Sequence, residues 1–220
     1  MADEFWGFAG DFEWGGVSST QPKQENPKLT PKNSHRRTVE CKEYSTQYEY
    51  RRAFSELHLI DAIGKEGLQQ GKSYAFITGG DVDALSYLKL VLRYQPRLRH
   101  ALATTWCMAA EDILQFREWV ENGVIGRLDI YVGEIFPSQY KIEWAMLRNM
   151  YQELQCGKLA YFRNHSKIFA GVGELFDFGI QTSANINTNP RTENGCITIG
   201  CGLYDFYKQY FDGIKSFDYE

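Results

Sequence analysis

Between residues 73 and 157 the chain alternates between two kinds of apolar pattern. Short continuous apolar runs, which are typical of buried strands, are followed by longer stretches with apolar residues at helical spacing. The strand-like runs are SYAFITGG, ALATTWCM and RLDIYVGEIF, and the helix-like stretches that follow them are DALSYLKLVLRYQP, AAEDILQFREWVENG and YKIEWAMLRNMYQELQCG. We expect Asp81 to cap the first helix and Pro96 to end it. Strands alternating with helices of this length predict a mainly parallel sheet covered on both faces.

After Gly157 the pattern changes to three strand-like runs joined by short turns that contain glycine. These runs are KLAYFRNHSKIFAGVG, LFDFGIQTSANI and ENGCITIGCG, and their turns predict hairpins. A final amphipathic stretch predicts a helix with Phe206, Tyr210 and Phe217 facing the interior. The expected fold class is therefore α/β, with a mixed, largely parallel sheet flanked by helices on both faces.

The first 40 residues differ in composition from the rest. Residues 15–40 are rich in Ser, Thr, Pro, Asn and Lys and nearly devoid of large apolar residues, so they predict a linker that buries too little surface to offset the entropy of ordering. The segment before it carries five aromatic residues among acids: Phe5, Trp6, Phe8, Phe12 and Trp14. It is either a flexible terminus or strap on the domain's own surface, or a short motif that docks on another protein. We therefore expect a tail over 1–40 and one domain over 41–220.

Charge and cysteine content restrict the functional class. The chain has 220 residues and a net charge of −4, so it has no bulk attraction for nucleic acid or anionic membranes, and any polyanion site must be local. Its five cysteines are odd in number and scattered, which favours a reducing compartment. The N-terminus lacks the pattern of a secretory signal, and no apolar stretch approaches the roughly 18 residues of a membrane helix. These features predict a soluble cytoplasmic protein that does not bind membranes.

Polar residues recur at corresponding places in the last three strand-like runs. His165 and Lys167 lie two apart on the first, Ser183 and Asn185 end the second, and Glu193 precedes the third. Hairpin neighbours bring such groups to one end of a sheet, where cross-strand side chains are about 5 Å apart. An unpaired cation in a buried strand costs several kcal/mol unless it is used, so we expect these five side chains to surround a space of the size of a phosphate.

The segments HSKI at 165–168 and TSANINTNPRTEN at 182–194 resemble the signature of the phospholipase D-like superfamily. That signature is a histidine, any residue and a lysine, followed later by a small Gly/Ser segment that ends in asparagine. The strand and helix pattern upstream extends the resemblance over residues 45–220. One departure is that the family's usual aspartate falls on Val172, with Asp177 a weak substitute in the turn. Because that aspartate resembles a structural more than a catalytic residue, its loss weakens the case for activity without removing it.

The resemblance implies phosphodiester chemistry through a covalent phosphohistidine, without a metal or cofactor. A histidine suits this chemistry because it is a neutral nucleophile or a charged acid near pH 7. Lys167 and Asn185 would hold the non-bridging oxygens, Glu193 would accept a hydrogen bond from a histidine ring, and Ser183 would help to position the phosphate. Arg163 and Arg191 are candidates for further phosphate contacts.

The implied mechanism needs two imidazoles, one to attack phosphorus and one to protonate the leaving oxygen. His35, His58 and His100 lie in the linker, on a helix and at the start of a strand without a partnering lysine, so only His165 qualifies. A homodimer with one composite site, to which each protomer contributes a His165, resolves the shortage.

The favoured function is a metal-independent nuclease, similar to small phospholipase D-like proteins of phage and other mobile elements. The acidic charge balance is the main objection, since nonspecific nucleases profit from a basic surface. One alternative is a catalytically inactive binding or assembly module that works through the aromatic N-terminus. Another is transfer to an alcohol in lipid metabolism.

Overall fold

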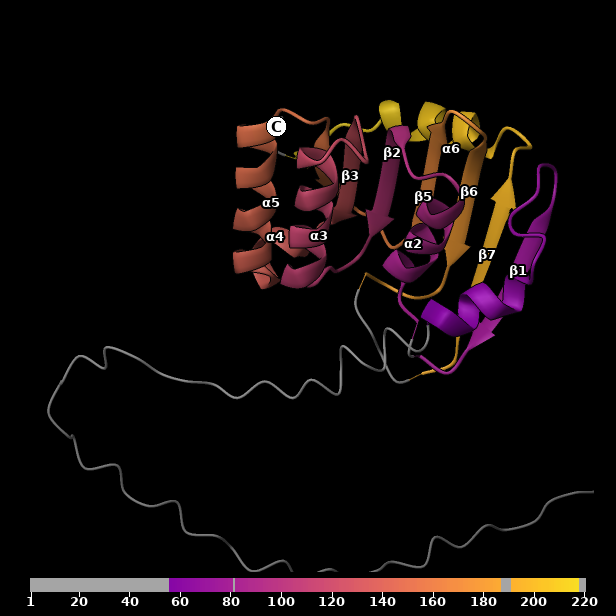
Figure 1. Cartoon of the computed structure of the whole chain (residues 1–220). Coiled ribbons are helices and arrows are strands. Elements are labelled where there is room, and N and C mark those ends of the chain that lie inside the picture. The colour runs from indigo at the N-terminus through magenta and orange to yellow at the C-terminus, as the bar shows by residue number, and fades with distance from the viewer. Residues whose placement is uncertain (1–55, 81, 187–190, 218–220) are drawn as a thin grey trace, which may run out of the picture. The chain divides into compact units, whose positions relative to one another are not determined.

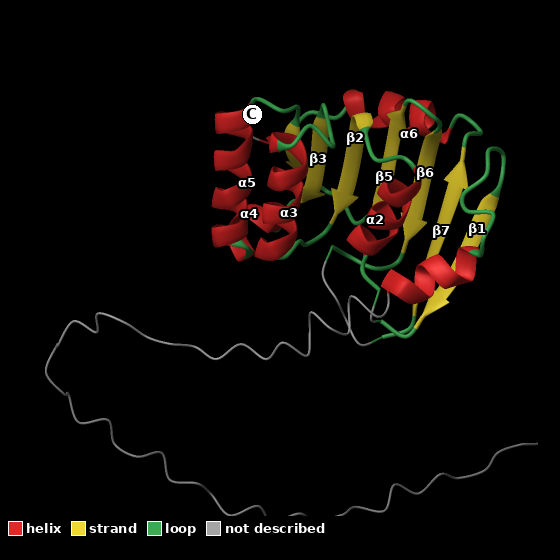
Figure 2. Cartoon of the chain, viewed as in Figure 1, coloured by secondary structure: helices red, strands yellow, loops and turns green. Residues whose placement is uncertain are grey.

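The computed structural model describes residues 56–80, 82–186 and 191–217, and these form a seven-stranded sheet with helices on both faces (Figures 1 and 2). The strands stand in the order β1-β7-β6-β5-β2-β3-β4. Their bounds are β1 Ser73–Thr78, β2 Leu98–Thr105, β3 Leu128–Gly133, β4 Leu159–Phe162, β5 Ile168–Gly173, β6 Asp177–Thr182 and β7 Glu193–Ile199.

The predicted α/β class with a mixed sheet is confirmed, but the sheet is not largely parallel. Among the strands of the described residues, the parallel pairs are β2 with β3 and β3 with β4. The pairs β1–β7, β7–β6, β6–β5 and β5–β2 are antiparallel. The physical reason is that the hairpin strands insert between β1 and β2, so the first strand of the alternating segment pairs with β7 and not with a parallel neighbour.

The two faces of the sheet carry separate apolar clusters. The larger one lies under α2 (Ala84–Tyr94), α3 (Ala110–Glu121) and α5 (Lys141–Leu154), with the short α4 (Phe136–Gln139) beside them. The smaller one lies under α6 (Leu203–Asp212), which contacts β5 and β6 and appears behind the sheet in Figure 2. Residues 56–63 form a further short helix. In the described part of the chain both faces are thus flanked, the first by several helices and the second by α6.

The run that we expected to form one strand from residue 158 to 173 forms two. β4 pairs with β3 at the edge of the sheet, whereas β5 lies on the other side of β2 and β3, beside β2. His165 and Lys167 therefore lie in the connection between two strands, not on a strand. The polar stretch RNHSK interrupts the apolar pattern, and Asn164 turns the chain there: its side-chain oxygen accepts hydrogen bonds from the Ser166 amide at 3.0 Å and the Ser166 hydroxyl at 2.6 Å.

Two local predictions about helices need correction. Asp83 caps α2 and accepts from the Ser86 amide at 2.8 Å, whereas Asp81 lies outside the described residues. On α6 the inward side chains are Tyr207 and Phe211, while Phe206 is 63% exposed and Tyr210 60% exposed. The amphipathic pattern was ambiguous because aromatic residues occupy both sides of α6. Phe217, also predicted to face inward, is 39% exposed and lies against Tyr161.

The predicted tail over 1–40, its five aromatic residues and the boundary at residue 41 lie outside the described residues. Within the part of the chain that the structure describes, no helix combines the length and apolar character needed to cross a membrane.

Candidate functional site

One end of the sheet, the lower end in Figure 1, brings together strand termini that are distant in sequence. β2 ends there at Thr105, β5 begins at Ile168 and β6 ends at Thr182. Their registers align these termini, since Thr104 pairs with Ile168, and Ile168 pairs with Gln181. The segments that contain the candidate residues thus leave the sheet at the same end, as the hairpin pattern predicts.

His165 and Lys167 differ sharply in exposure. The histidine is exposed and its ring lies against Trp106, with ring centroids 5.3 Å apart. Lys167 is only 8% exposed, and its Nζ donates to the His165 carbonyl oxygen at 2.8 Å and lies 3.3 Å from His165 Nδ1. Because an ammonium group has only donors, Nδ1 faces it as an acceptor and the proton of the neutral ring lies on Nε2. The lysine therefore sets both the position and the tautomer of the imidazole.

The environment of Lys167 disfavours its charged form. Burial lowers the pKa of Lys167 below its ordinary value, and interactions with Cys107 and Glu193 act in the opposite direction. Among the described residues Lys167 has no ion pair within 4.0 Å. A partly desolvated ammonium without a bonded carboxylate is suited to bind an anion that arrives from outside.

The strands on either side hold the His165 segment in place. Thr104 Oγ1, at the end of β2, lies 2.8 Å from Ser166 Oγ and accepts from the Ile168 amide at 3.1 Å. Asn164 Nδ2 donates to the Tyr131 carbonyl oxygen at 3.2 Å. Gly133 leaves room for Trp106, because a Cβ there would lie 2.5 Å from the Trp106 ring. Sequence reasoning missed these supporting residues, although Trp106 lies within the predicted strand ALATTWCM.

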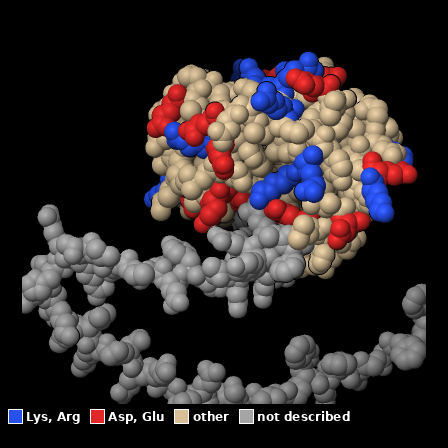
Figure 3. Space-filling model, in the orientation of Figure 1, with Lys and Arg blue, Asp and Glu red and all other residues tan. Residues whose placement is uncertain are grey.

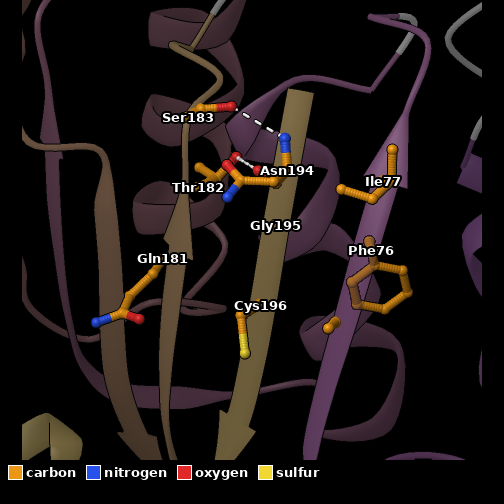
Figure 4. Close-up of a pocket in the computed structure, with 9 residues that line it drawn as sticks. Phe76, Ile77, Gln181, Thr182, Ser183, Asn194, Gly195 and Cys196 are labelled. Atoms are coloured by element: carbon orange, nitrogen blue, oxygen red, sulfur yellow. Dashed lines mark hydrogen bonds between the residues drawn. The ribbon is translucent and has the colours of Figure 1, made fainter. Parts of the chain in front are cut away.

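Ser183 and Glu193 meet across the β6–β7 hairpin. The Ser183 hydroxyl donates to the Glu193 carboxylate and accepts from the Asn194 amide at 3.0 Å, and the second of these bonds is drawn in Figure 4. Thr182 Oγ1 donates to the Asn194 carbonyl oxygen at 2.7 Å beside it. The predicted hydrogen bond from a histidine ring to Glu193 is not present among the described residues of one protomer. Within the protomer, this carboxylate holds Ser183 and affects Lys167 through its charge.

The hairpin also borders an open groove of about 430 Å³ on the sheet face beside β1, β6 and β7. Ser183, Asn194, Cys196 and Ile77 are among its lining residues, and Figure 4 shows them on three neighbouring strands. Ile77 is 76% exposed in this groove. Gly195 lies between these residues because a Cβ there would come within 2.4 Å of the Tyr87 ring packed beneath it.

Asn185 lies two residues beyond Ser183, and its backbone carbonyl accepts from the Ala84 amide at 3.1 Å. Its side-chain oxygen is buried and has no hydrogen-bond partner among the described residues. A buried polar atom of this kind costs free energy and marks a place where a bound molecule or water would be stabilised.

The two predicted arginines lie at different places. Arg163 is exposed and lines a hollow beside α6 together with His165, whereas Arg191 is exposed just before β7. On the face shown in Figure 3, lysines and arginines lie among aspartates and glutamates without forming one continuous basic field. On this face a polyanion would therefore be held by local contacts and not by a broad surface charge.

The position at which the sequence resemblance predicts an aspartate, Val172, lies away from this end of the sheet. Val172 is near the other end of β5 and pairs in register with His100. Four strand residues beyond Ile168 correspond to about 13 Å. Asp177, the weak substitute, pairs with Val172 across the hairpin and so lies at the same distant end. Among the described residues, no group of three or more His, Cys, Asp or Glu side chains is arranged to hold a metal ion.

Comparison with known proteins identifies the fold only. No family model matches the sequence, and no curated protein matches it. Solved structures that resemble it include the polyphosphate kinase of Porphyromonas gingivalis, with a TM-score of 0.50 and 11% identity over 66% of this chain and 26% of the kinase. A second is the phosphatidylserine synthase of Haemophilus influenzae, with a TM-score of 0.47 and 14% identity over 63% of this chain and 38% of the synthase. The chain spans well under half the length of either protein. The likeness to the kinase is one of fold alone.

Proposed function

We propose that this protein is a phosphodiesterase, in particular a nuclease, that acts through a phosphohistidine at a site shared by two protomers. The observation that carries the proposal is the pairing of an exposed imidazole with a buried ammonium at the edge where Ser183 and Glu193 also lie. The fold and the motif agree with this assignment, since both are those of phospholipase D-like proteins.

In the proposed reaction, one imidazole attacks phosphorus and the bond to the leaving oxygen breaks as a second imidazole protonates that oxygen. Water then attacks the phosphohistidine and releases the phosphate product. Lys167 and Asn185 stabilise the non-bridging oxygens, where charge accumulates in the transition state. The histidine that acts as the acid is an imidazolium, protonated on both ring nitrogens, and it becomes neutral when it gives one proton to the leaving oxygen. The histidine that attacks is a neutral imidazole whose reacting nitrogen carries no proton.

Turnover in the presence of EDTA tests the reaction class. Single- and double-stranded DNA, RNA and a chromogenic phosphodiester are incubated with the purified protein and with His165→Ala. We expect cleavage by the wild-type chain that falls by a factor of about 100 or more in the variant, the range for loss of a catalytic proton-transfer group. Activity on none of these substrates would favour the inactive binding module, and activity confined to phosphatidylcholine vesicles would favour the lipid-metabolising alternative.

Mixed dimers test the shared site. Wild-type and His165→Ala chains are mixed, dissociated and reassociated at several ratios, with total protein constant. If each site needs two His165 residues, activity follows the square of the wild-type fraction, because only wild-type pairs are complete. A linear dependence would show that each chain acts alone, and a strict monomer in light scattering would contradict the shared site directly.

A further inference from the structure

A second hollow, of about 320 Å³, lies between α6 and the segment that carries His165. Four aromatic residues of α6, Phe206, Tyr207, Tyr210 and Phe211, line one side of it, and Arg163 and His165 are on the other. We call this the aromatic hollow. Its volume is at the lower end of the roughly 300–1,000 Å³ found for small-molecule sites, so it suits one compact group and not a helix or a strand.

The aromatic side chains of the hollow fall into two groups. Tyr207 is 5% exposed and Phe211 2% exposed, and both pack into the smaller core under α6. Phe206 and Tyr210 are 63% and 60% exposed, although they lie four residues apart on the same helix and contact the buried rings. Two exposed rings on a rigid helix, beside a buried aromatic pair, provide apolar surface without contributing to the core.

The charge around the hollow restricts what it can bind. The residues that line it include the cation Arg163 and the imidazole of His165 but no acidic side chain. A purely apolar ligand would gain nothing from Arg163, and a basic peptide would be repelled. The arrangement fits a ligand in which a planar apolar group is joined directly to an anion.

We propose that the aromatic hollow binds a nucleobase adjacent to the phosphate that reacts at His165. This inference rests on the proposed function and names its substrate: nucleic acid that is single-stranded at that position, DNA or RNA. Nucleobases stack on aromatic side chains whatever their sequence, and a base has a free face only where it is not stacked within a duplex. The site would thus bind locally, by stacking together with Arg163, which accounts for nucleic-acid binding by a chain with a net charge of −4.

The test compares the binding of an oligonucleotide that carries bases with the binding of one that lacks them. Fluorescence anisotropy measures the Kd of a labelled single-stranded oligothymidylate with a cleavage-resistant phosphorothioate backbone, and of the same oligomer with abasic sugars, in EDTA. The variants are wild type, Phe206→Leu/Tyr210→Leu, and Phe217→Leu as a matched control for an aromatic residue outside the hollow. Matched RNA and duplex probes distinguish the nucleic-acid sources.

We expect the double variant to raise the Kd of the oligothymidylate by about tenfold or more, the usual cost of losing a stacking ring, and to leave the abasic probe unaffected. Phe217→Leu should leave both unchanged. In turnover assays the double variant should raise KM and preserve kcat. Because both replaced rings are exposed, far-UV circular dichroism should show an intact fold.

Several results would overturn the inference. One is equal binding of base-containing and abasic probes by the wild-type chain. Another is no detectable binding of either probe. A third is conversion of a dimer to a monomer by the double variant in light scattering, which would make the hollow a contact between copies. A fourth, with phosphatidylcholine vesicles as an added probe, is that the double variant loses binding to the vesicles and keeps the wild-type Kd for the oligothymidylate. Cleavage without base dependence would refute this inference and leave the proposed function standing. Base-dependent binding without cleavage of any phosphodiester would support this inference and refute the proposed function.

Discussion

The two ends of the sheet each contain a buried charged side chain, and the two side chains differ in the number of their hydrogen-bond partners. At the end where β3 begins, Asp129 is 1% exposed, and its carboxylate bonds His100 Nε2 at 2.9 Å, the Lys158 amide at 2.7 Å and Arg127 Nε at 3.2 Å. His100 is itself held on its other ring nitrogen by the Tyr204 hydroxyl at 2.7 Å. At the opposite end, Lys167 is almost as buried, and its ammonium bonds only groups of His165 among the described residues.

The pKa values of the two charged groups follow this difference. Burial opposes the charged form of Asp129, but the hydrogen bonds from His100 and Lys158 and the charges of His100 and Arg127 outweigh it, so the pKa of Asp129 is lowered. For Lys167 burial is the larger effect, so the pKa of Lys167 is lowered and its charged form is disfavoured. A buried charge with a full set of partners stabilises the fold, whereas one with few partners costs stability and is available for a ligand. The comparison teaches that His100 on β2 belongs to a fully bonded structural network, whereas the surroundings of His165 support the functional role that we propose for it.

The largest expected effect is that of Lys167→Met. If Lys167 stabilises the reacting phosphate as proposed, removing its cation should lower kcat/KM by about 100- to 1,000-fold. The free energy of unfolding should at the same time rise by about 1 kcal/mol or stay unchanged, because an apolar chain of similar size replaces a desolvated charge. Turnover assays and urea titration measure the two effects. Lys72→Met, which removes an exposed lysine, is the control and should change neither. A clear loss of stability in Lys167→Met would contradict the comparison.

The opposite pattern is expected at the other end. Asp129→Ala leaves His100, Arg127 and the Lys158 amide without their shared acceptor and should lower the free energy of unfolding by about 3 kcal/mol. The turnover of the protein that remains folded should equal that of the wild type. Urea titration provides the first quantity, and activity normalised to the folded fraction the second. Asp61→Ala, at an exposed position, should change stability by less than about 0.5 kcal/mol.

Acid should act through Asp129 with a defined sign. Because the pKa of Asp129 is lower in the folded state than in the unfolded chain, its stabilisation is complete above the unfolded value of about 3.9. It is lost as the pH falls through that value toward the lower folded pKa. The midpoint of urea unfolding should therefore decrease below about pH 4, and Asp129→Ala should flatten this dependence. An identical acid profile for both proteins would show that other carboxylates control acid unfolding.

The smallest effect is expected at Glu193. Its charge raises the pKa of Lys167, so Glu193→Gln should lower that pKa further. The alkaline limb of the pH–rate profile, where the ammonium loses its proton, should then move to lower pH. Because Ser183 also loses its ionised acceptor, Ser183→Ala is the control that separates the two causes, and it should leave the alkaline limb in place. An unmoved limb in Glu193→Gln would remove Glu193 from the electrostatics of Lys167.

Local patterns predicted most elements of the fold but not their neighbours. The predicted runs SYAFITGG, ALATTWCM and RLDIYVGEIF overlap the strands at 73–78, 98–105 and 128–133, and the antiparallel hairpins after Gly157 are present. The sheet is nevertheless mostly antiparallel, because pairing between β1 and β7 or between β2 and β5 joins segments that are far apart in sequence. Such pairings depend on the packing of the whole chain, which periodicity does not record.

The same limit applies to the candidate site. The spacing of His165, Lys167, Ser183 and Glu193 in the sequence identified them as candidates. The hairpin argument placed their segments at one end of the sheet. It did not show that Lys167 is buried beneath an exposed His165, or that Trp106 lies against the imidazole. Nor did it show which rings of α6 face outward, since aromatic residues occupy both sides of that helix.

The amino-acid sequence by itself determined the α/β class, the hairpin segment and the motif, because each depends on residues close together in the chain. The tertiary structure alone decided the strand order, the split between β4 and β5, and the contrast between a fully partnered Asp129 and a sparsely partnered Lys167. The physical reason is that burial and hydrogen-bond partners are set by segments distant in sequence, and these decide whether a charge stabilises the fold or remains available for a ligand.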